Sequence, residues 1–268
     1  MPELPEVETV RRVLCKKVLN KKISSIDVIY GNIIKNDIKF FKDNLVNDCF
    51  INILRKGKYL IFETNNNYLI SHLRMEGKFF YKDKFNGYTK HDHVSINFID
   101  GSKLIYNDVR KFGTMELISK DKIDDYFIKL GKEPKYLDIE YVRMKVCKSN
   151  KPVKTILLDQ SIIAGLGNIY VNEVLYESKV SPFKLGKDLS TYDIDNVIKS
   201  SVRIIDKAID EGGCTIRSYT SSLGVTGNYQ NYLKVHMKDN EVCSICNKKI
   251  KKEKIGGRST YYCEGCQR

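Results

Sequence analysis

The first apolar positions of the chain recur three or four residues apart, which places them on one face of a helix. These positions are Val7, Val10, Leu14 and Val18. Pro5 stands in the first turn, and Glu6 and Glu8 lie near the positive end of the helix dipole. The pattern therefore predicts a helix that ends near Asn20.

Residues 23–118 change to short runs rich in β-branched and aromatic side chains. The clearest runs are 51–54, 58–62, 68–72, 94–99 and 103–106. Asp100-Gly101 between the last two runs is a hairpin signal. Many short strands separated by turns favour a β-sandwich, and we expect the first helix to cap it.

The pattern becomes helical from about Asp121, with apolar helical spacing over residues 156–160, 170–178 and 194–208. The segment Ala164-Gly165-Leu166-Gly167-Asn168 separates two of these stretches. Its glycines would let the backbone approach a phosphate closely. An ordinary connection between two helices has the same composition, so these residues alone leave both interpretations open.

Cysteine spacing divides the eight cysteines into two groups. Four stand far apart in a chain without an export signal, and we expect them to be reduced and buried: Cys15, Cys49, Cys147 and Cys214. The others form two C-x2-C pairs separated by sixteen residues: Cys243, Cys246, Cys263 and Cys266. This spacing is typical of four thiolates around one structural Zn²⁺, with two disulfides or free thiols as the alternative.

These patterns predict an α+β protein in three parts. We expect a β-sandwich catalytic domain with a capping helix over residues 1–120 and a helical domain over residues 121–233. A zinc finger should follow over residues 234–268.

Charge then indicates the partner. Lysine and arginine exceed aspartate and glutamate by 46 − 33 = +13 in a chain of 268 residues, so a polyanion is the natural partner. No apolar run approaches the length of a membrane-spanning helix, and no lipidation motif accompanies the charge. We therefore expect a cytoplasmic protein that binds nucleic acid rather than a membrane.

The amino terminus offers a candidate nucleophile. If Met1 is removed, Pro2 presents a secondary amine, and an α-amino group titrates near about pH 8. Attack of such an amine on C1′ of a sugar yields an iminium ion, which acidifies C2′ and allows elimination of the 3′ phosphate. Glu3 could act as general acid or base. From these residues alone, a frayed end before a helix is the favoured interpretation.

Several segments together resemble the formamidopyrimidine-DNA glycosylases, in order from the second residue to the last. They are PELPEVETVRR, RKGKYL, SHLRMEGKF, KHDHV, NDVRKFGT, LLDQSIIAGLGNIYVNEVL and GGRSTYYCEGCQR. The resemblance implies a helix–two-turn–helix in the helical domain and a β-hairpin that carries the zinc. The related endonuclease VIII branch is similar in the helical turn and zinc finger but differs around PELPE.

The resemblance implies a bacterial, nucleoid-associated, monomeric enzyme of base excision repair. It would excise 8-oxoguanine and formamidopyrimidines from double-stranded DNA and cleave the abasic site by β,δ-elimination. Two alternatives stay open: an endonuclease VIII-like glycosylase for oxidised pyrimidines, and a non-catalytic zinc protein that binds DNA.

Four catalytic residues follow from the resemblance. Pro2 would be the Schiff-base nucleophile, and Glu3 would protonate the opening sugar and assist base loss. Lys58 would contact the phosphate beside the lesion and donate a proton in β-elimination. Arg258 would clamp phosphate and assist δ-elimination, for which the arginine fork is suited.

The remaining site residues are also implied by the resemblance, and they divide by role. Residues that fill the space left by the extruded nucleotide are Met75, Arg110 and Phe112. Residues that bind DNA phosphates are His72, His91, Lys154 and Asn168, and Arg110 would also contact DNA. Residues that cover the lesion are Glu76, Ser218 and Tyr219. Val109 stands where the family commonly has proline, which removes no functional side chain.

Overall fold

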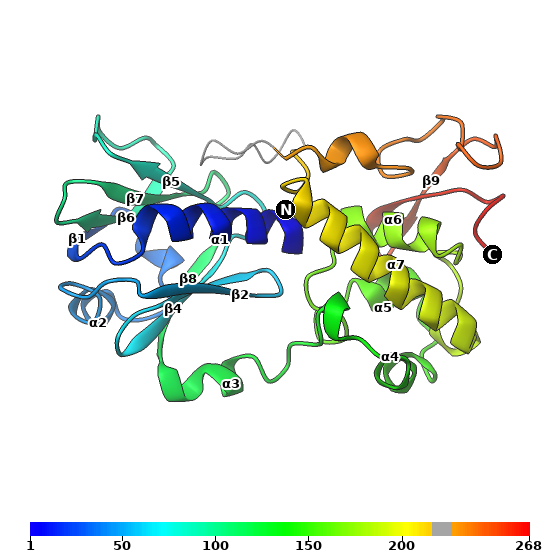
Figure 1. Cartoon of the computed structure of the whole chain (residues 1–268), viewed down its shortest axis with the longest axis horizontal. Coiled ribbons are helices and arrows are strands. Elements are labelled where there is room, and N and C mark those ends of the chain that lie inside the picture. The colour runs from blue at the N-terminus through cyan, green and yellow to red at the C-terminus, as the bar shows by residue number, and fades with distance from the viewer. Residues whose placement is uncertain (216–226) are drawn as a thin grey trace. The chain divides into compact units, whose positions relative to one another are not determined.

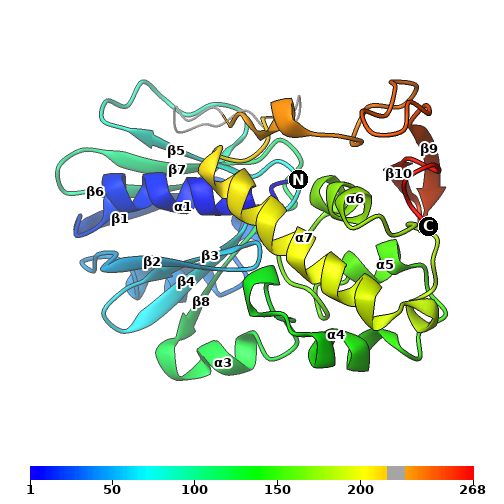
Figure 2. The same ribbon diagram turned by 45° about the vertical axis from the view of Figure 1, so that its right-hand side comes forward.

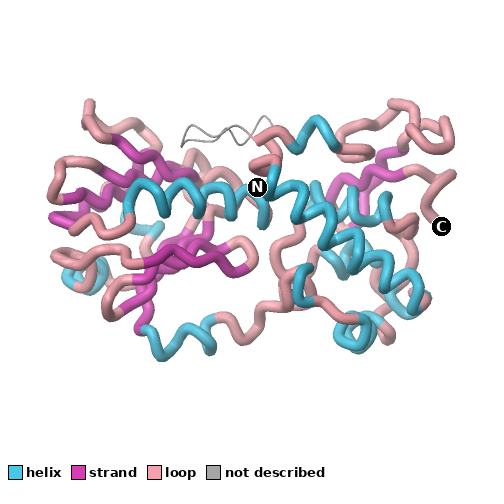
Figure 3. The backbone as a smooth tube through the Cα atoms, viewed as in Figure 1, coloured by secondary structure: helices cyan, strands magenta, loops and turns pink. Residues whose placement is uncertain are grey.

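The computed structural model describes residues 1–215 and 227–268, and its contacts divide the chain into two compact units (Figure 1). The first unit comprises Met1–Ile128 with Gly212–Gly227, and the second comprises Lys129–Glu211 with Asn228–Arg268. Strands dominate the first unit, whereas helices and one strand hairpin make up the second (Figure 3). The expected α+β class is confirmed.

The first unit contains two four-stranded antiparallel sheets that form a sandwich (Figure 2). One sheet has the order β1-β6-β7-β5: Ile23–Val28, Asp92–Phe98, Lys103–Asn107 and Lys78–Lys82. The other has the order β2-β3-β4-β8: Asn52–Lys56, Tyr59–Glu63, Asn67–His72 and Thr114–Ser119. Gly101 adopts a positive φ of 85° in the turn between β6 and β7, as the predicted hairpin requires.

Helix α1 (Leu4–Val18) is the predicted first helix and contributes directly to the sandwich core. All four of its predicted apolar positions are buried, and they pack in one cluster with side chains of both sheets. The cluster also contains Phe50, Phe62, Phe79 and Tyr106. Burial of this apolar face stabilises the helix against the sheets and thereby fixes the position of its first residues.

Three strands of the first unit were not among the predicted runs. They are β1, β5 and β8, which complete the two sheets. Short helical elements lie between strands and at the end of the unit: Gly31–Ile33, α2 (Ile38–Asp43), Lys120–Lys122 and α3 (Ile123–Tyr126). The Asp37 carboxylate accepts a hydrogen bond from the backbone N–H of Phe40 and so caps α2.

The second unit contains four α-helices and the hairpin of β9 and β10 (Figure 2). The helices are α4 (Ile139–Val146), α5 (Val153–Leu157), α6 (Asn168–Glu177) and α7 (Thr191–Asp210). The strands are β9 (Lys251–Ile255) and β10 (Arg258–Tyr262). Single 3₁₀ turns cover Pro134–Tyr136, Gly186–Asp188 and Tyr229–Tyr232. The turn with positive φ at Gly165 joins α5 to α6, so the predicted break between helices is present.

The two units group some segments differently from the expected parts. Residues 121–128 and the described residues 212–215 belong to the same unit as the sandwich, and the zinc hairpin shares one unit with the helices. Among the described residues, no helix is both long enough and apolar enough to cross a membrane.

Candidate active site and zinc centre

The amino-terminal ammonium lies in a partly buried position in the first unit, at the start of α1. Burial lowers the pKa of this group on Met1 from its ordinary value of 8.0, and the Lys58 charge lowers it further. The carboxylates of Glu3, Glu6 and Glu76 act in the opposite direction. The net effect is a lowered pKa for the Met1 amine, and Pro2 beside it is buried in the same surroundings.

The predicted catalytic residues of the first unit are withdrawn from bulk water. Pro2 is buried, and the exposed fractions of Glu3 and Lys58 are only 3% and 4%. Lys58 lies in the two-residue turn between β2 and β3, where Gly57 adopts a positive φ of 57°. The structure therefore brings the terminal amine, an acid and a lysine together, and their charges influence one another more strongly than in water.

Glu6 is a residue of this site that sequence reasoning assigned only to the helix start. Its Oε2 accepts a hydrogen bond from the backbone N–H of Glu3 at 2.8 Å, and its Oε1 accepts one from Cys214 at 2.7 Å. A Cβ on Gly213 would lie 2.7 Å from Glu6 Oε1, so only glycine fits there. Glu6 thus ties the segment at Gly213–Cys214 to the catalytic amino terminus. Its position as the third residue of a helix was the available signal.

His72 lies opposite Tyr59 in the register of β4 and β3, next to the turn that carries Lys58. Burial, followed by the charges of Arg74 and Lys58, lowers the pKa of His72 to about 3, so the ring is neutral. Nδ1 accepts a hydrogen bond from the backbone N–H of Arg74 at 2.9 Å, which leaves the proton on Nε2. The ring therefore offers one neutral N–H donor, a group that can bind a phosphate oxygen.

Met75, Arg110 and Phe112 lie on two loops of the first unit. All three are exposed, and 54% of the Phe112 side chain is accessible although it is a large apolar group. The Arg110 guanidinium lies 4.8 Å from the centroid of the Phe112 ring. The carboxylate of Asp108, which is fully buried, accepts hydrogen bonds from the backbone N–H groups of Arg110, Phe112 and Gly113 at 2.9, 3.0 and 2.8 Å.

Tyr106 joins the bases of these two loops. A Cβ on Gly77 would lie 2.3 Å from the Tyr106 hydroxyl oxygen, and a Cβ on Gly113 would lie 1.6 Å from it. The hydroxyl also donates to Asp108 Oδ2 at 3.3 Å. Sequence reasoning missed Tyr106 and Asp108 because both look like ordinary strand-end residues. The only signal was an aspartate placed to bind backbone N–H groups a few residues ahead.

Glu76 is half-buried, and its charge acts on the amino-terminal amine, so it belongs to the same site. Ser218 and Tyr219 lie outside the described residues. His91 is half-buried, and its backbone carbonyl accepts a hydrogen bond from the backbone N–H of Asp108 at 3.0 Å.

In the second unit, Asn168 begins α6 and its Nδ2 donates to the backbone carbonyl of Ser259 at 3.0 Å. This contact joins the helical turn to β10. Arg258 precedes Ser259, is exposed and follows a two-residue turn. Both turn residues, Gly256 and Gly257, have positive φ, as a tight hairpin turn requires.

The prediction that Lys154 binds DNA phosphate needs correction. The side chain is fully buried, because its ammonium donates hydrogen bonds to three acceptors inside the second unit. These acceptors are Asn172 Oδ1 at 2.9 Å, the Ser259 carbonyl at 2.8 Å and Thr260 Oγ1 at 2.9 Å. Lys154 therefore holds β10 against α5 and α6, and a lysine already surrounded in this way is not presented to a phosphate.

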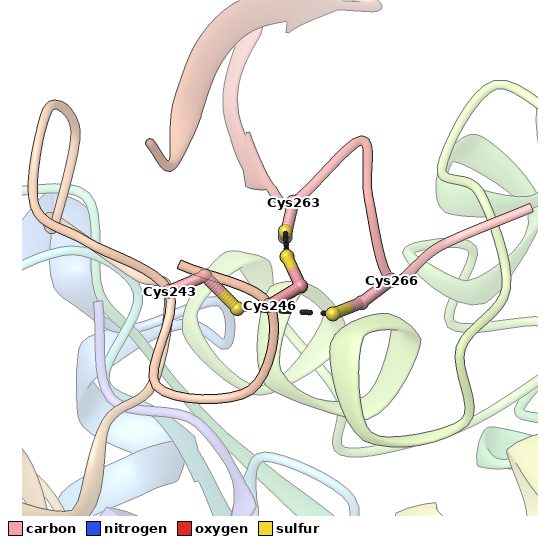
Figure 4. Close-up of side chains that lie close together, drawn as sticks. All are labelled: Cys243, Cys246, Cys263 and Cys266. Carbon is pink, nitrogen blue, oxygen red and sulfur yellow. Dashed lines mark hydrogen bonds between the residues drawn. The ribbon is translucent and has the colours of Figure 1, made fainter. Parts of the chain in front are cut away.

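The four tail cysteines converge on one point (Figure 4). Their sulfur atoms all lie within 4.8 Å of one another, with Cys243 to Cys266 at 3.7 Å and Cys246 to Cys263 at 3.3 Å. A disulfide needs about 2.05 Å, whereas a zinc–sulfur bond of about 2.3 Å implies edges of about 3.8 Å in a tetrahedron. The four thiols are free and fit one structural zinc.

The surroundings of Cys243 favour a thiolate. Burial raises its pKa, but hydrogen bonds from Tyr176 and from the backbone N–H groups of Cys246 and Ile245 outweigh burial and lower the pKa to about 6. The Tyr176 hydroxyl lies 3.2 Å from Cys243 Sγ. Tyr176 thereby connects α6 to the cysteine cluster.

Three family models match successive parts of this chain. The "Formamidopyrimidine-DNA glycosylase N-terminal domain" matches residues 1–115, and the "Formamidopyrimidine-DNA glycosylase H2TH domain" matches residues 130–220. The "Zinc finger found in FPG and IleRS" matches residues 240–268, which contain the cysteine cluster.

Relatives and solved structures agree with these models along the whole chain. Formamidopyrimidine-DNA glycosylase of Streptococcus pneumoniae R6 is 44% identical over 100% of this chain and 99% of its own length. The enzyme of Lactococcus lactis subsp. cremoris is 47% identical over 100% of this chain and 99% of its own length. A Lactococcus lactis structure with Fapy-dG containing DNA has a TM-score of 0.95 at 45% identity and covers 100% of both chains. A second, with abasic-site DNA, has a TM-score of 0.95 at 45% identity over 99% of both chains. The chain belongs to the formamidopyrimidine-DNA glycosylase family.

Proposed function

We propose that this protein is a bifunctional DNA glycosylase and abasic-site lyase that removes oxidised purines in base excision repair. The observation that carries the proposal is the geometry at the amino terminus, where Pro2, Glu3 and Lys58 are all buried and the charges of Glu3, Lys58 and Glu76 act on the terminal ammonium. Solved relatives hold DNA with Fapy-dG or an abasic site, and we extend that substrate class to this chain, with 8-oxoguanine included.

In the proposed reaction, removal of Met1 makes Pro2 the terminal amine. Its nitrogen lone pair attacks C1′ while the bond to the base breaks, and the base takes up a proton as it leaves. Glu3 protonates the ring oxygen as the sugar opens, so the C1′–N bond becomes an iminium. The position of Glu3 supports this role, because its buried carboxylate lies close enough to the terminal ammonium for their charges to interact.

The iminium acidifies C2′, and loss of a C2′ proton expels the 3′ phosphate. A second elimination expels the 5′ phosphate, and water then releases the sugar fragment from Pro2. We assign Lys58 to the phosphate beside the lesion and to proton transfer in the first elimination. Arg258 would clamp phosphate during the second elimination, and its exposure on the hairpin turn supports that assignment.

Extrusion of the damaged nucleotide leaves a gap in the stack that side chains must fill. We assign this role to Met75, Arg110 and Phe112, because the first and last are large apolar side chains exposed on adjoining loops. Glu76, Ser218 and Tyr219 would cover the extruded base. We assign phosphate contacts to His72, His91 and Asn168. We assign Lys154 a positioning role, because it holds β10 through its hydrogen bonds to Ser259 and Thr260.

One structural zinc, held by the four tail cysteines, stabilises the knuckle next to the β9–β10 hairpin when bound. We propose that the parts 1–120, 121–233 and 234–268 act as catalytic, DNA-binding and zinc-finger domains. The limits of the three family models support this division. We further propose that the enzyme is monomeric and works in the cytoplasm at the nucleoid.

Excision from matched duplexes tests the proposed substrate class. The zinc-loaded enzyme should release 8-oxoguanine faster than thymine glycol, and borohydride should trap it covalently on both 8-oxoguanine and abasic DNA. The amino-terminal mass should correspond to loss of Met1. Preference for thymine glycol would indicate an endonuclease VIII-like activity. Absence of trapping would indicate a non-catalytic protein that binds DNA.

A further inference from the structure

The second unit contains a hollow of about 470 Å³ that none of the residues assigned to DNA lines. Its deep walls are the buried side chains of Tyr176, Ile204 and Tyr229, and Ile245 of the first cysteine knuckle lies at its mouth. Ile245 is 63% exposed although it is aliphatic. A concave surface that combines buried apolar side chains with an exposed apolar residue and a few charged groups is typical of a binding site.

Lysines surround the mouth of this hollow. Lys179, Lys207 and Lys234 line it and are exposed, and none of them forms an ion pair with a carboxylate among the described residues. The Lys207 ammonium lies 3.9 Å from the centroid of the Tyr232 ring. The mouth therefore presents positive charge beside an aromatic surface.

The acidic groups that line the hollow are already engaged. Glu173 is buried, and its carboxylate accepts three backbone hydrogen bonds, from residues 234–236, at 2.8 to 3.0 Å. Glu177 pairs with Arg203. Neither carboxylate is available to neutralise the three lysines.

A second hollow, of about 590 Å³, continues from the first along α6 and α7. The two share Glu177, Lys179 and Arg203 in their walls. Tyr192, which is 74% exposed, lies at the second hollow. Together they form a groove with apolar side chains in both hollows, which are Tyr192, Ile198 and Val202 in the second, and this suits an extended segment better than one small molecule.

We propose that this groove is a docking site for a short acidic peptide segment of a partner protein. Two apolar side chains of the segment occupy the two hollows, and its carboxylates lie against Lys179, Lys207 and Lys234. Charge complementarity supports this occupant, because the lysines are the unneutralised groups at the mouth. A nucleotide fits less well, since no Asn or Gln lines the first hollow to recognise a base edge.

The probe is a short fluorescein-labelled peptide rich in Asp and Glu that carries two leucines, titrated against the full zinc-loaded chain by fluorescence anisotropy. The double substitution Lys207→Ala with Lys234→Ala should weaken binding about tenfold or more, because two charge contacts are lost. The matched double substitution Lys84→Ala with Lys148→Ala removes the same charge from exposed lysines outside both hollows. It should change the affinity less than about twofold. Both variants should excise 8-oxoguanine at the unmodified rate, which shows that they fold.

Two further arms separate docking from non-specific attraction. A peptide with serine in place of both leucines should bind much more weakly, and saturating undamaged duplex DNA should leave the original peptide bound. Equal losses in the two double variants, equal binding of the serine peptide, or displacement by duplex DNA would each overturn the proposal. Displacement by deoxyguanosine monophosphate would instead assign the hollow to nucleotides and would also overturn it.

Discussion

Glu3 and Pro2 are neighbours in the chain, but the proposed reaction uses them in different steps. Release of a damaged base needs a proton at the opening sugar, whereas a preformed abasic site already has a C1′ aldehyde that needs only an amine. Glu3→Gln should therefore slow 8-oxoguanine excision by about 10²- to 10⁴-fold, the usual value of general acid–base help. Cleavage of abasic DNA should be much less affected, as measured in single-turnover reactions on both substrates.

An N-terminal extension that blocks the Pro2 amine provides the control for this prediction. It should abolish borohydride trapping on both DNAs, because no free amine is left to form the iminium. Equal losses for Glu3→Gln on the two substrates would contradict the division of roles. Undiminished trapping with the blocked terminus would move the nucleophile to a lysine, with Lys58 the first to test.

Lys154 is a buried residue whose hydrogen bonds should stabilise the second unit rather than bind DNA phosphate. Lys154→Met keeps most of the side-chain volume but removes one hydrogen-bond donor from each of the acceptors on Asn172, Ser259 and Thr260. The free energy of unfolding should fall by about 3 kcal/mol, measured by thermal or denaturant unfolding. The salt slope of duplex affinity should stay unchanged.

Lys148→Met is the matched control, because Lys148 is an exposed lysine of the same unit. It should leave the unfolding free energy within about 0.5 kcal/mol of the original. The opposite result for Lys154→Met would be an unchanged unfolding free energy with a salt slope reduced by about one phosphate contact. That result would mean that Lys154 binds DNA phosphate directly.

The two loops that carry Met75 and Phe112 behave as one element because Tyr106 lies between their glycines. Gly113→Ala places a Cβ 1.6 Å from the Tyr106 hydroxyl and should cost about 1–3 kcal/mol of stability. Adding Tyr106→Phe removes that oxygen and should recover part of the loss, as measured by thermal unfolding and by 8-oxoguanine excision.

Gly77→Ala is the contrasting variant at the other loop. Its Cβ would also lie 2.6 Å from the Leu73 backbone carbonyl, which a change at Tyr106 cannot remove. Tyr106→Phe should therefore rescue Gly77→Ala less than it rescues Gly113→Ala. Rescue of neither variant would mean that the hydroxyl does not join the loops, and equal rescue of both would mean that the Leu73 carbonyl does not restrict Gly77.

The zinc knuckle is the second element with a testable function. Cys246→Ser removes one thiolate of the cluster, so zinc should be lost and the hairpin with Arg258 should lose its order. Metal content by atomic absorption should fall, and affinity for abasic duplex should weaken. Of the four separate cysteines expected to be buried, only Cys214 is, and Cys147 is exposed. Cys147→Ser, outside the cluster, should retain both properties. Full zinc content and affinity in Cys246→Ser would contradict the assignment.

For the whole molecule, the net charge of +13 predicts how DNA affinity depends on salt. Affinity for undamaged duplex should come mainly from phosphate contacts, and its logarithm should fall linearly with the logarithm of salt concentration, by about 0.9 per neutralised phosphate. Titrations at several salt concentrations measure this slope. An affinity independent of salt would mean that the basic surface is not the DNA-binding surface.

Patterns of local origin were predicted well from the sequence. The apolar spacing of α1, the hairpin at Gly101 and the convergence of the tail cysteines all appear in the structure. Strands β1, β5 and β8 were missed, because a strand completed by its neighbours need not carry a strong pattern of its own.

The sequence by itself determined the class of the protein, the first helix, the cysteine cluster and the candidate nucleophile, since each depends on spacing within a short segment. The hydrogen bonds and the burial that depend on segments distant in the sequence were decided only by the tertiary structure. Glu6 receives a hydrogen bond from Cys214 across 208 positions, and Lys154 becomes buried because β10, more than a hundred residues later, supplies acceptors for its ammonium. A side chain's surroundings, rather than its type, set its burial, its hydrogen bonds and therefore its role.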